Sequence, residues 1–382
     1  MVRPEGSAFL AWLPARKESG LRHEGSAFLA WLRKLMGARA RKAQPRTKRP
    51  HIGVDSEFSS SPLVALQRLK NANIDLQTLV TYSNSVQDFC SFVVEQLDSQ
   101  HSSDDYTLDE WAAFYVLDLA RRKKGVQKAN NILAALLHFL PSLKGHIPEL
   151  ARCVTGFRQE RPPIVRLPIS RDMTGSLILT LLDTRTESGE EAAAIAWTQW
   201  ELCGRISEVL NLHDEDVVFA DRPLISFSLA PSRRGASTKN DQDVGVVSFS
   251  RGLRLLLERI RQRHARRDRR QRRRSRRRRF FMLSRKKYEQ LFREAQRLLW
   301  YPILPTHCIR HGRASHEAAE GLPVPDQLEL GRWRSRQSAA RYRKPHLLVE
   351  AESRVFSPDV LRQGRNFFSD PVECLQTKWR AP

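Results

Sequence analysis

The chain of 382 residues is 41% hydrophobic and contains eight Trp, which is enough apolar material for two domains with cores of their own. Its formal net charge of +23 predicts a polyanionic partner, most simply nucleic acid. The five cysteines form no Cys-x-x-Cys pair, which argues against both a disulfide framework and a zinc site.

Residues 1–62 are predicted to form a disordered basic tail. The stretch Glu5–Leu13 (EGSAFLAWL) recurs identically at Glu24–Leu32, which indicates a recent duplication or an error in the gene model rather than a selected site. Arg33–Pro50 is basic and has no acidic residue, which is typical of a solvated tail or of a nuclear or organellar address. No apolar run approaches the ~18 residues of a membrane span, and Ser7–Leu13 is too short for a secretory signal, so we expect neither membrane insertion nor secretion.

Residues 63–160 are predicted to form a helical domain. Apolar side chains recur there at three- and four-residue spacings, which predicts helices over Leu76–Phe92, Leu108–Leu119 and Asn130–Leu140. Arg161-Pro162-Pro163 and Pro168 then break helical structure and predict a linker.

A second domain is predicted over residues 165–355, with mixed but mainly helical structure. Alternating or continuous apolar residues predict strands at Leu224–Leu229 and Val244–Phe249 with a polar hairpin between them. Helical periodicity marks Ser170–Leu182, Glu190–Cys203, Gly204–Leu212, Gly252–Arg263 and Tyr288–Leu299.

An arginine-rich insert at about residues 262–279 holds most of the charge. Nineteen Lys and Arg against two acidic residues give Arg251–Lys287 a charge of +17, which leaves +6 of the total +23 for the rest of the chain. Ala265–Arg279 is of low complexity and is not expected to pack a core. Nonspecific phosphate binding, nuclear import and a tolerated low-complexity loop are all open interpretations.

The most informative residues lie between His307 and Tyr342. His307 and Arg310 share one face of a predicted helix, Trp333 follows 23 residues after Arg310, and Tyr342 follows nine residues after Trp333. An arginine can hold two phosphate oxygens with its planar fork, a histidine can accept or donate a proton, and an indole N–H can only donate. This set suits attack by the Tyr342 phenol on a phosphodiester, although a free tyrosine with a pKa of about 10 needs help to lose its proton.

The His-x-x-Arg box, the spacing from Trp333 to Tyr342 and the sequence Gly204-Arg205-Ile206-Ser207-Glu208 together resemble the tyrosine recombinase (phage integrase) family. The resemblance covers roughly residues 75–370. It implies that Arg205, Lys239, His307, Arg310, Trp333 and Tyr342 are catalytic, with Lys239 on a hairpin as the general acid. Glu208 would orient its neighbours, while Arg233, Arg234 and His311 are candidates for DNA contact.

The family further implies a mainly α fold with a small antiparallel sheet, in which a helical core-binding domain and a catalytic domain close as a clamp on double-stranded DNA. Residues 356–382 are expected to dock on a neighbouring subunit of a homotetramer on DNA. No metal, ATP or small-molecule cofactor is expected, and the location is the nucleus in a eukaryote or otherwise the cytoplasm and nucleoid. A type IB topoisomerase and an inactive nucleic-acid-binding remnant of a mobile element remain the alternatives.

Overall fold

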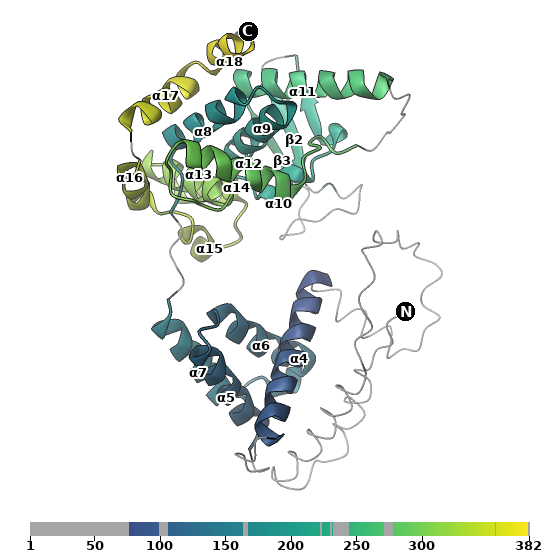
Figure 1. Cartoon of the computed structure of the whole chain (residues 1–382), viewed down its shortest axis with the longest axis vertical. Helices are drawn as coiled ribbons and strands as arrows, with labels where there is room; N and C mark the ends of the chain where they lie inside the picture. The colour runs from purple at the N-terminus through teal and green to yellow at the C-terminus, as the bar shows by residue number, and fades with distance from the viewer. Residues whose placement is uncertain are drawn as a thin grey trace. The chain divides into compact units, whose positions relative to one another are not determined.

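The computed structural model describes residues 76–98, 106–162, 167–221, 224–229, 231, 244–270, 278–355 and 357–380. The chain divides into two compact units, Met1–Ile164 and Val165–Pro382, which are drawn in Figure 1. Across the described residues the structure is mainly α-helical with one small antiparallel sheet, so the predicted fold class is confirmed. The predicted N-terminal tail and its repeat lie outside the described residues.

The described part of the first unit is a helical bundle. It consists of α4 (Leu76–Asp98), α5 (Leu108–Arg121), α6 (Val126–Phe139), the short 3-10 helix η3 (Pro141–Leu143) and α7 (Pro148–Glu160). Thr107 starts α5 because its side chain accepts the backbone N–H of Glu110 while the Glu110 carboxylate accepts the N–H of Thr107. The aromatic rings of Phe89 and Phe92 from α4 pack on Tyr115 of α5, with centroids 5.6 and 5.4 Å apart, and form the centre of this core.

Two helices of this unit differ from the sequence expectations. α6 begins at Val126 after Gly125, four residues before the predicted start at Asn130, because Gly125 takes an extended conformation and serves as the N-cap. α7 was not predicted as a separate helix. It starts with Pro148 in its first turn, and its buried residues Leu150, Val154 and Phe157 repeat at helical spacing.

The second unit contains a three-stranded antiparallel sheet in the order β1-β2-β3. The strands are β1 (Val217–Phe219), β2 (Ile225–Leu229) and β3 (Val244–Ser248), and Phe227 of β2 pairs with Val217 on one side and Val246 on the other. The 3-10 helix η4 (Asp214–Asp216) precedes β1. The helices are α8 (Arg171–Asp183), α9 (Glu187–Glu201), α10 (Ile206–Leu210), α11 (Arg251–Arg270), α12 (Arg285–Leu298), α13 (Cys308–Ala319), α14 (Val324–Gly331), α15 (Arg336–Ala340), α16 (Pro345–Ser353), α17 (Pro358–Ser369) and α18 (Pro371–Arg380).

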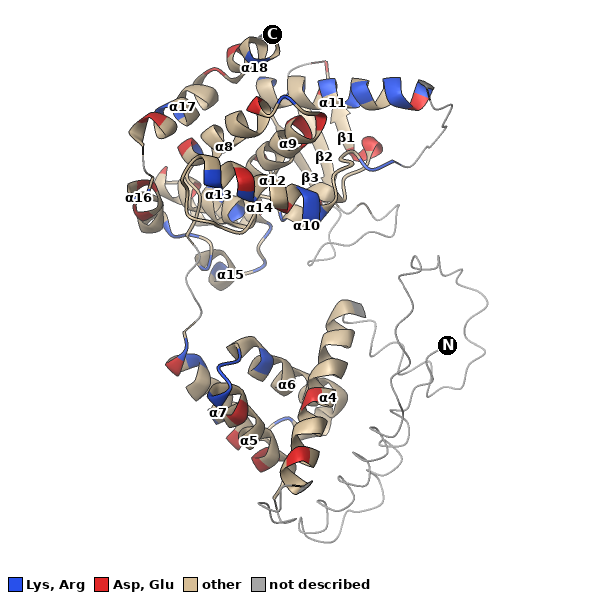
Figure 2. Cartoon of the chain, viewed as in Figure 1, with Lys and Arg blue, Asp and Glu red and all other residues tan. Residues whose placement is uncertain are grey.

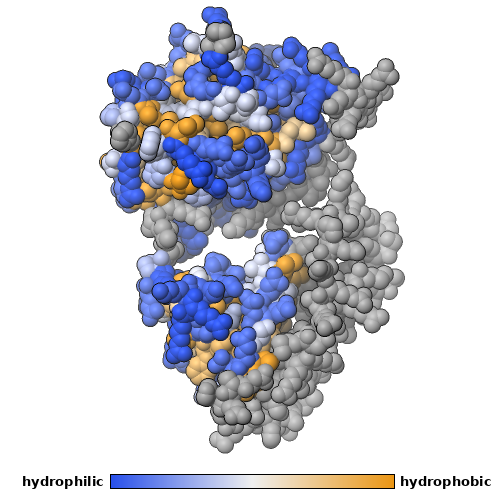
Figure 3. Space-filling model, in the orientation of Figure 1, coloured by the Kyte–Doolittle hydropathy of each residue, from blue (hydrophilic) through white to orange (hydrophobic). Residues whose placement is uncertain are grey.

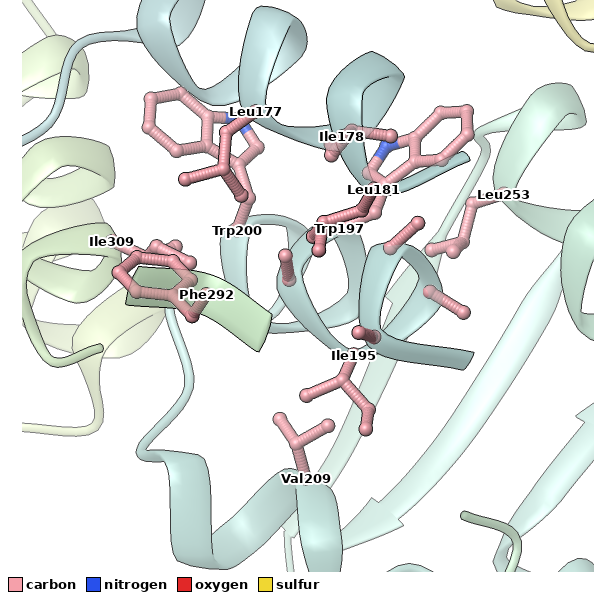
Figure 4. Close-up of a cluster of buried hydrophobic side chains, with 14 of the residues drawn as sticks. Leu177, Ile178, Leu181, Ile195, Trp197, Trp200, Val209, Leu253, Phe292 and Ile309 are labelled. Atoms are coloured by element: carbon pink, nitrogen blue, oxygen red, sulfur yellow. The ribbon is translucent and has the colours of Figure 1, made fainter. Parts of the chain in front are cut away.

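Helix α9 lies at the centre of the second unit. All residues from Ala192 to Trp200 are buried, so this helix is surrounded by other elements on every side. Figure 4 shows Trp197 and Trp200 of α9 within the buried cluster that also contains Leu177 of α8 and Phe292 of α12. Since α10 and α13 also contribute to this core, it supports the two segments that hold the predicted arginines.

The C-terminal helices pack on the second unit of their own chain. α17 runs along α8, and α18 contacts α11 (Figure 1). Phe367 and Leu375 are completely buried, and the ring of Phe367 lies 4.8 Å from that of Trp197. These two apolar side chains are therefore buried within their own chain.

The visible surface of both units is mostly hydrophilic, with a band of apolar residues on the second unit (Figure 3). Lys and Arg are concentrated along α11 toward its C-terminal end (Figure 2). No helix among the described residues is long and apolar enough to cross a membrane.

Candidate active site

Helix α13 carries the His-x-x-Arg box at its N-terminal end. His307 is the residue immediately before the helix, and Arg310 lies in the first turn. Arg310 is 0% exposed, and its guanidinium donates to the carbonyls of Cys203 at 2.6 Å and Gly331 at 2.5 Å. Its Nε has no hydrogen-bond partner among the described residues. Because a buried charge needs polar partners, these two bonds stabilise the guanidinium and tie two distant turns together.

Tyr342 follows the short helix α15 and is held by its backbone. Its N–H donates to the carbonyl of Ala339 at 2.8 Å. Its own carbonyl accepts from Ser315 Oγ at 2.8 Å, and the same Oγ accepts the backbone N–H of Lys344 at 3.0 Å. Since Ser315 is fully buried on α13, the segment around Tyr342 is fastened to the helix that bears Arg310.

Two imidazoles flank the phenol of Tyr342. His307 Nε2 lies 3.3 Å from Tyr342 Oη, and the ring of His311 stacks on the tyrosine ring with centroids 4.5 Å apart and an interplanar angle of 29°. A separation of 3.3 Å is long for a hydrogen bond but leaves the two atoms within reach of proton transfer after a small movement. His307 is therefore placed to accept the phenolic proton.

Trp333 closes the other side of the tyrosine. The two rings lie 5.0 Å apart at 32°, and the Arg310 guanidinium lies 5.1 Å from the centre of the Trp333 ring. Trp333 is 8% exposed, and its Nε1 has no hydrogen-bond partner within the described parts of the chain. Because an indole N–H can only donate, Trp333 can act both as a packing wall and as a donor to an anionic oxygen.

Glu208 connects the two predicted arginine boxes. Arg205 is the N-cap of α10, and the Glu208 carboxylate accepts its N–H at 2.8 Å and pairs with its guanidinium at 2.5 Å. The same carboxylate lies 3.9 Å from Arg310 Nη1 and 2.8 Å from Arg332 Nη2. Burial alone would raise the pKa of Glu208, but Arg332, the Arg205 N–H, Arg310 and the Arg205 guanidinium together hold this pKa below its ordinary value. Glu208 therefore remains an anion among cations.

The structure places the described members of the predicted site in one cluster. Around Tyr342 lie His307, His311, Arg310 and Trp333, and Arg205 joins them through Glu208. Lys239, Arg233 and Arg234 lie outside the described residues.

Two residues of this cluster were not predicted from the sequence. Arg332 directly precedes Trp333, yet nothing in the sequence indicates that it adopts a left-handed conformation with φ of 54°. Ser315 has no sequence signal beyond its position on the predicted helix. Both act through hydrogen bonds to segments more than twenty residues away, which local patterns do not reveal.

The arginine-rich insert is more ordered than expected. α11 continues to Arg270, seven residues beyond the predicted end at Arg263. Arg263 pairs with Glu190 at 2.5 Å, and Arg278 pairs with Asp214 at 2.9 Å and with Asp268, its side chain only 14% exposed. Arg278 is therefore held by ion pairs while it stays partly exposed, and no described residue of Ala265–Arg279 is buried in a core.

Other arginines of the insert remain at the surface. Arg266, Arg267 and Arg269 are exposed, and none of them forms an ion pair with a described acidic residue. The C-terminal end of α11 and helix α15, which precedes Tyr342, lie at opposite ends of the second unit in Figure 1. In the parts that the structure describes, no group of three or more His, Cys, Asp or Glu is arranged to hold a metal ion.

Solved structures of recombinases and integrases share this fold. The XerH site-specific recombinase bound to difH substrate, in a pre-cleavage complex, matches with a TM-score of 0.54 and 13% identity over 88% of this chain and 97% of that chain. The XerH post-cleavage complex with palindromic difH matches with a TM-score of 0.51 and 13% identity over 76% of this chain and 83% of that chain. The Tn1549 transposon integrase in complex with circular intermediate DNA matches with a TM-score of 0.50 and 12% identity over 76% of this chain and 97% of that chain.

No protein-family model and no curated relative matches the sequence. The resemblance to tyrosine recombinases that the motifs indicated is nevertheless confirmed at the level of the fold, since the matches cover most of the chain.

Proposed function

We propose that the chain is a site-specific DNA recombinase or integrase that cleaves and rejoins double-stranded DNA through a 3′-phosphotyrosyl link to Tyr342. The observation that carries this proposal is the convergence of three groups. The phenolic oxygen lies 3.3 Å from His307 Nε2, and the ring lies 5.3 Å from the Arg310 guanidinium. DNA as the partner is supported by the neighbours in fold, which include a recombinase bound to its difH substrate and an integrase in complex with DNA.

The cleavage step uses groups that the chain itself supplies. Tyr342 Oη passes its proton to His307 and attacks the phosphorus, and the bond from phosphorus to the 5′ oxygen breaks. Arg205, Arg310 and Trp333 donate to the nonbridging oxygens, where negative charge develops. Lys239 gives the departing 5′ oxygen its proton. The covalent link conserves the energy of the broken bond, so attack by a 5′ hydroxyl of another strand reverses the step and rejoins DNA.

The proposed assembly has two units of each chain closing on duplex DNA, with the helical first unit as the core-binding part and four chains forming the synapse. A protein with this function acts where DNA is, in the nucleus of a eukaryote or in the nucleoid of a bacterium. The net charge of +23 supports a polyanionic partner.

A nicked suicide substrate tests the proposal. Duplexes enriched from the genomic sequence that flanks the gene are nicked so that the short fragment with the 5′ hydroxyl diffuses away after cleavage, which traps the covalent complex. We expect trapping by the unmodified protein and none by Tyr342→Phe, with DNA binding retained. Tyr82→Phe, which changes a tyrosine of the first unit, is the matched control and should trap normally. Gel shifts without any adduct would favour the inactive remnant, and relaxation of plasmids without a special site by a monomer would favour the topoisomerase.

A further inference from the structure

The side chain of Arg332 is buried beside the candidate site and contacts residues of a distant segment. It ends α14 in the left-handed conformation, with φ of 54°, and this turn directs the next residue, Trp333, onto Arg310. Its side chain is 6% exposed. One guanidinium nitrogen donates to the carbonyl of Leu202 at 2.8 Å and the other to Glu208 Oε2 at 2.8 Å. A non-glycine residue in this backbone region is uncommon, and it is held here by those buried contacts.

The charges of this cluster do not cancel. Among the described residues, three guanidinium groups, those of Arg205, Arg310 and Arg332, surround the carboxylate of Glu208, and these four groups together carry a net charge of +2. Attack of a phenolate on a phosphodiester produces a five-coordinate phosphorus group with two negative charges. A buried excess of two positive charges therefore matches the transition state better than the singly charged ground state.

The two oxygens of Glu208 have different partners. Oε1 pairs with the Arg205 guanidinium at 2.5 Å, whereas Oε2 lies 2.8 Å from Arg332 and 3.9 Å from Arg310. Without Arg332, Oε2 would be left with Arg310 and the backbone N–H of Arg205 as its partners. The Oε2 atom would then compete with phosphate for the guanidinium group of Arg310.

We propose that Arg332 is a positioning residue of the DNA cleavage site: it engages Oε2 of Glu208, so that Arg310 remains available to a phosphodiester and the site keeps its excess of positive charge. This inference rests on the proposed function. It assigns Arg332 no contact with DNA and makes its effect depend on Glu208.

The dependence on Glu208 gives a rescue test. Single-turnover trapping rates and DNA affinities are measured on the nicked substrate for the unmodified protein, Arg332→Gln, Glu208→Gln and the double variant. Gln and Arg both have a Cβ and are equally strained at a positive φ, so a difference between the variants reports on the guanidinium group rather than on the backbone. Arg332→Gln lowers the site charge to +1, and the double variant restores it to +2.

We expect Arg332→Gln to slow trapping on the order of 10- to 100-fold with little change in DNA affinity, and the double variant to recover most of that loss. Arg293→Gln, which removes an exposed arginine of α12, is the control for total charge and should trap at the normal rate. A normal rate for Arg332→Gln, or a double variant no faster than Arg332→Gln, would overturn the inference.

Two further results keep the test decisive. Should Arg332→Gln fail to fold, Arg332→Lys replaces it, because a lysine keeps one charge but cannot reach both Leu202 and Glu208 with a planar fork. That variant is expected to trap about 10-fold more slowly, and a normal rate would overturn the inference. Absence of trapping by the unmodified protein would instead contradict the proposed function itself.

Discussion

The ring of Tyr342 covers the guanidinium of Arg310, with 5.3 Å between the guanidinium carbon and the ring centre. The predicted nucleophile thus lies over the predicted phosphate ligand, and Arg310 has no exposed surface. The ring of Trp333 also lies over this guanidinium, so a phosphate can reach it only after a covering side chain moves. The backbone bonds from Ser315 hold the segment in place, so the required movement is one of the side chain rather than of α13.

Replacing Arg310 by lysine tests whether the planar fork matters. Lysine keeps the charge but cannot serve the carbonyls of Cys203 and Gly331 together, so we expect a loss of about 1–3 kcal/mol in the free energy of unfolding. Trapping on the nicked substrate should fall by about 10²- to 10³-fold. Arg293→Lys on the surface of α12 should change neither quantity. Normal trapping by Arg310→Lys would show that the cleavage step does not need the guanidinium of Arg310.

Glu208 predicts a specific dependence of stability on pH. Folding lowers its pKa from the ordinary value of 4.5. The stabilisation is therefore fully present above that value and is lost as the pH falls through the lower pKa of the folded state. We expect Glu208→Gln to be less stable than the unmodified protein by about 3 kcal/mol at pH 7 and by less at pH 3, where the unfolded carboxyl is protonated. Urea unfolding at both pH values measures the difference, and a gap that stays constant would contradict the ion-pair account.

The contact between α8 and α17 depends on glycine. A Cβ at Gly364 would lie 1.7 Å from the carbonyl of Asp172, so Gly364→Ala should lower the free energy of unfolding by about 1–3 kcal/mol. Gly156→Ala in α7 meets no atom within 4 Å and should stabilise its helix by about 0.5–1 kcal/mol. Opposite shifts in Tm are expected, and a neutral Gly364→Ala would show that α17 does not dock on α8 in solution.

We expect the arginines of the insert to fall into two groups: those that stabilise the fold through ion pairs, and those that are exposed and do not affect stability. Arg263 pairs with Glu190, and both side chains are largely buried, so Arg263→Gln should cost about 1 kcal/mol of stability. Arg267 is exposed and pairs with no described acidic residue, so Arg267→Gln should leave Tm unchanged. Thermal unfolding of the two variants, which have the same net charge, distinguishes them. Equal effects would mean that the ion pair contributes nothing.

Much of the site could be predicted because its chemistry is encoded in local spacings. His307 and Arg310 share a helix face at i and i+3, and Pro305 precedes that helix. The eight residues between Trp333 and Tyr342 are enough for the chain to pass through α15 and return the phenol to the indole. Helix and strand periodicity likewise predicted α8, α9, β2 and β3 with small errors at their ends.

The remaining features depend on contacts between distant residues. α11 extends into an arginine run whose local pattern predicts no packing. Arg263 of this helix pairs with Glu190, and Arg278, beyond the helix, pairs with Asp214 and Asp268. The left-handed turn at Arg332 is stabilised by Leu202 and Glu208, which lie more than a hundred residues earlier. The C-terminal helices pack on their own chain through Gly364 and Phe367, which could equally have met a neighbouring subunit.

The identity of the residue that becomes attached to DNA tests the central claim most directly. The trapped complex is digested with nuclease and protease, and the peptide that bears the nucleotide is sequenced by mass spectrometry. The account predicts a 3′-phosphonucleotide on Tyr342. Attachment to any other residue would contradict it.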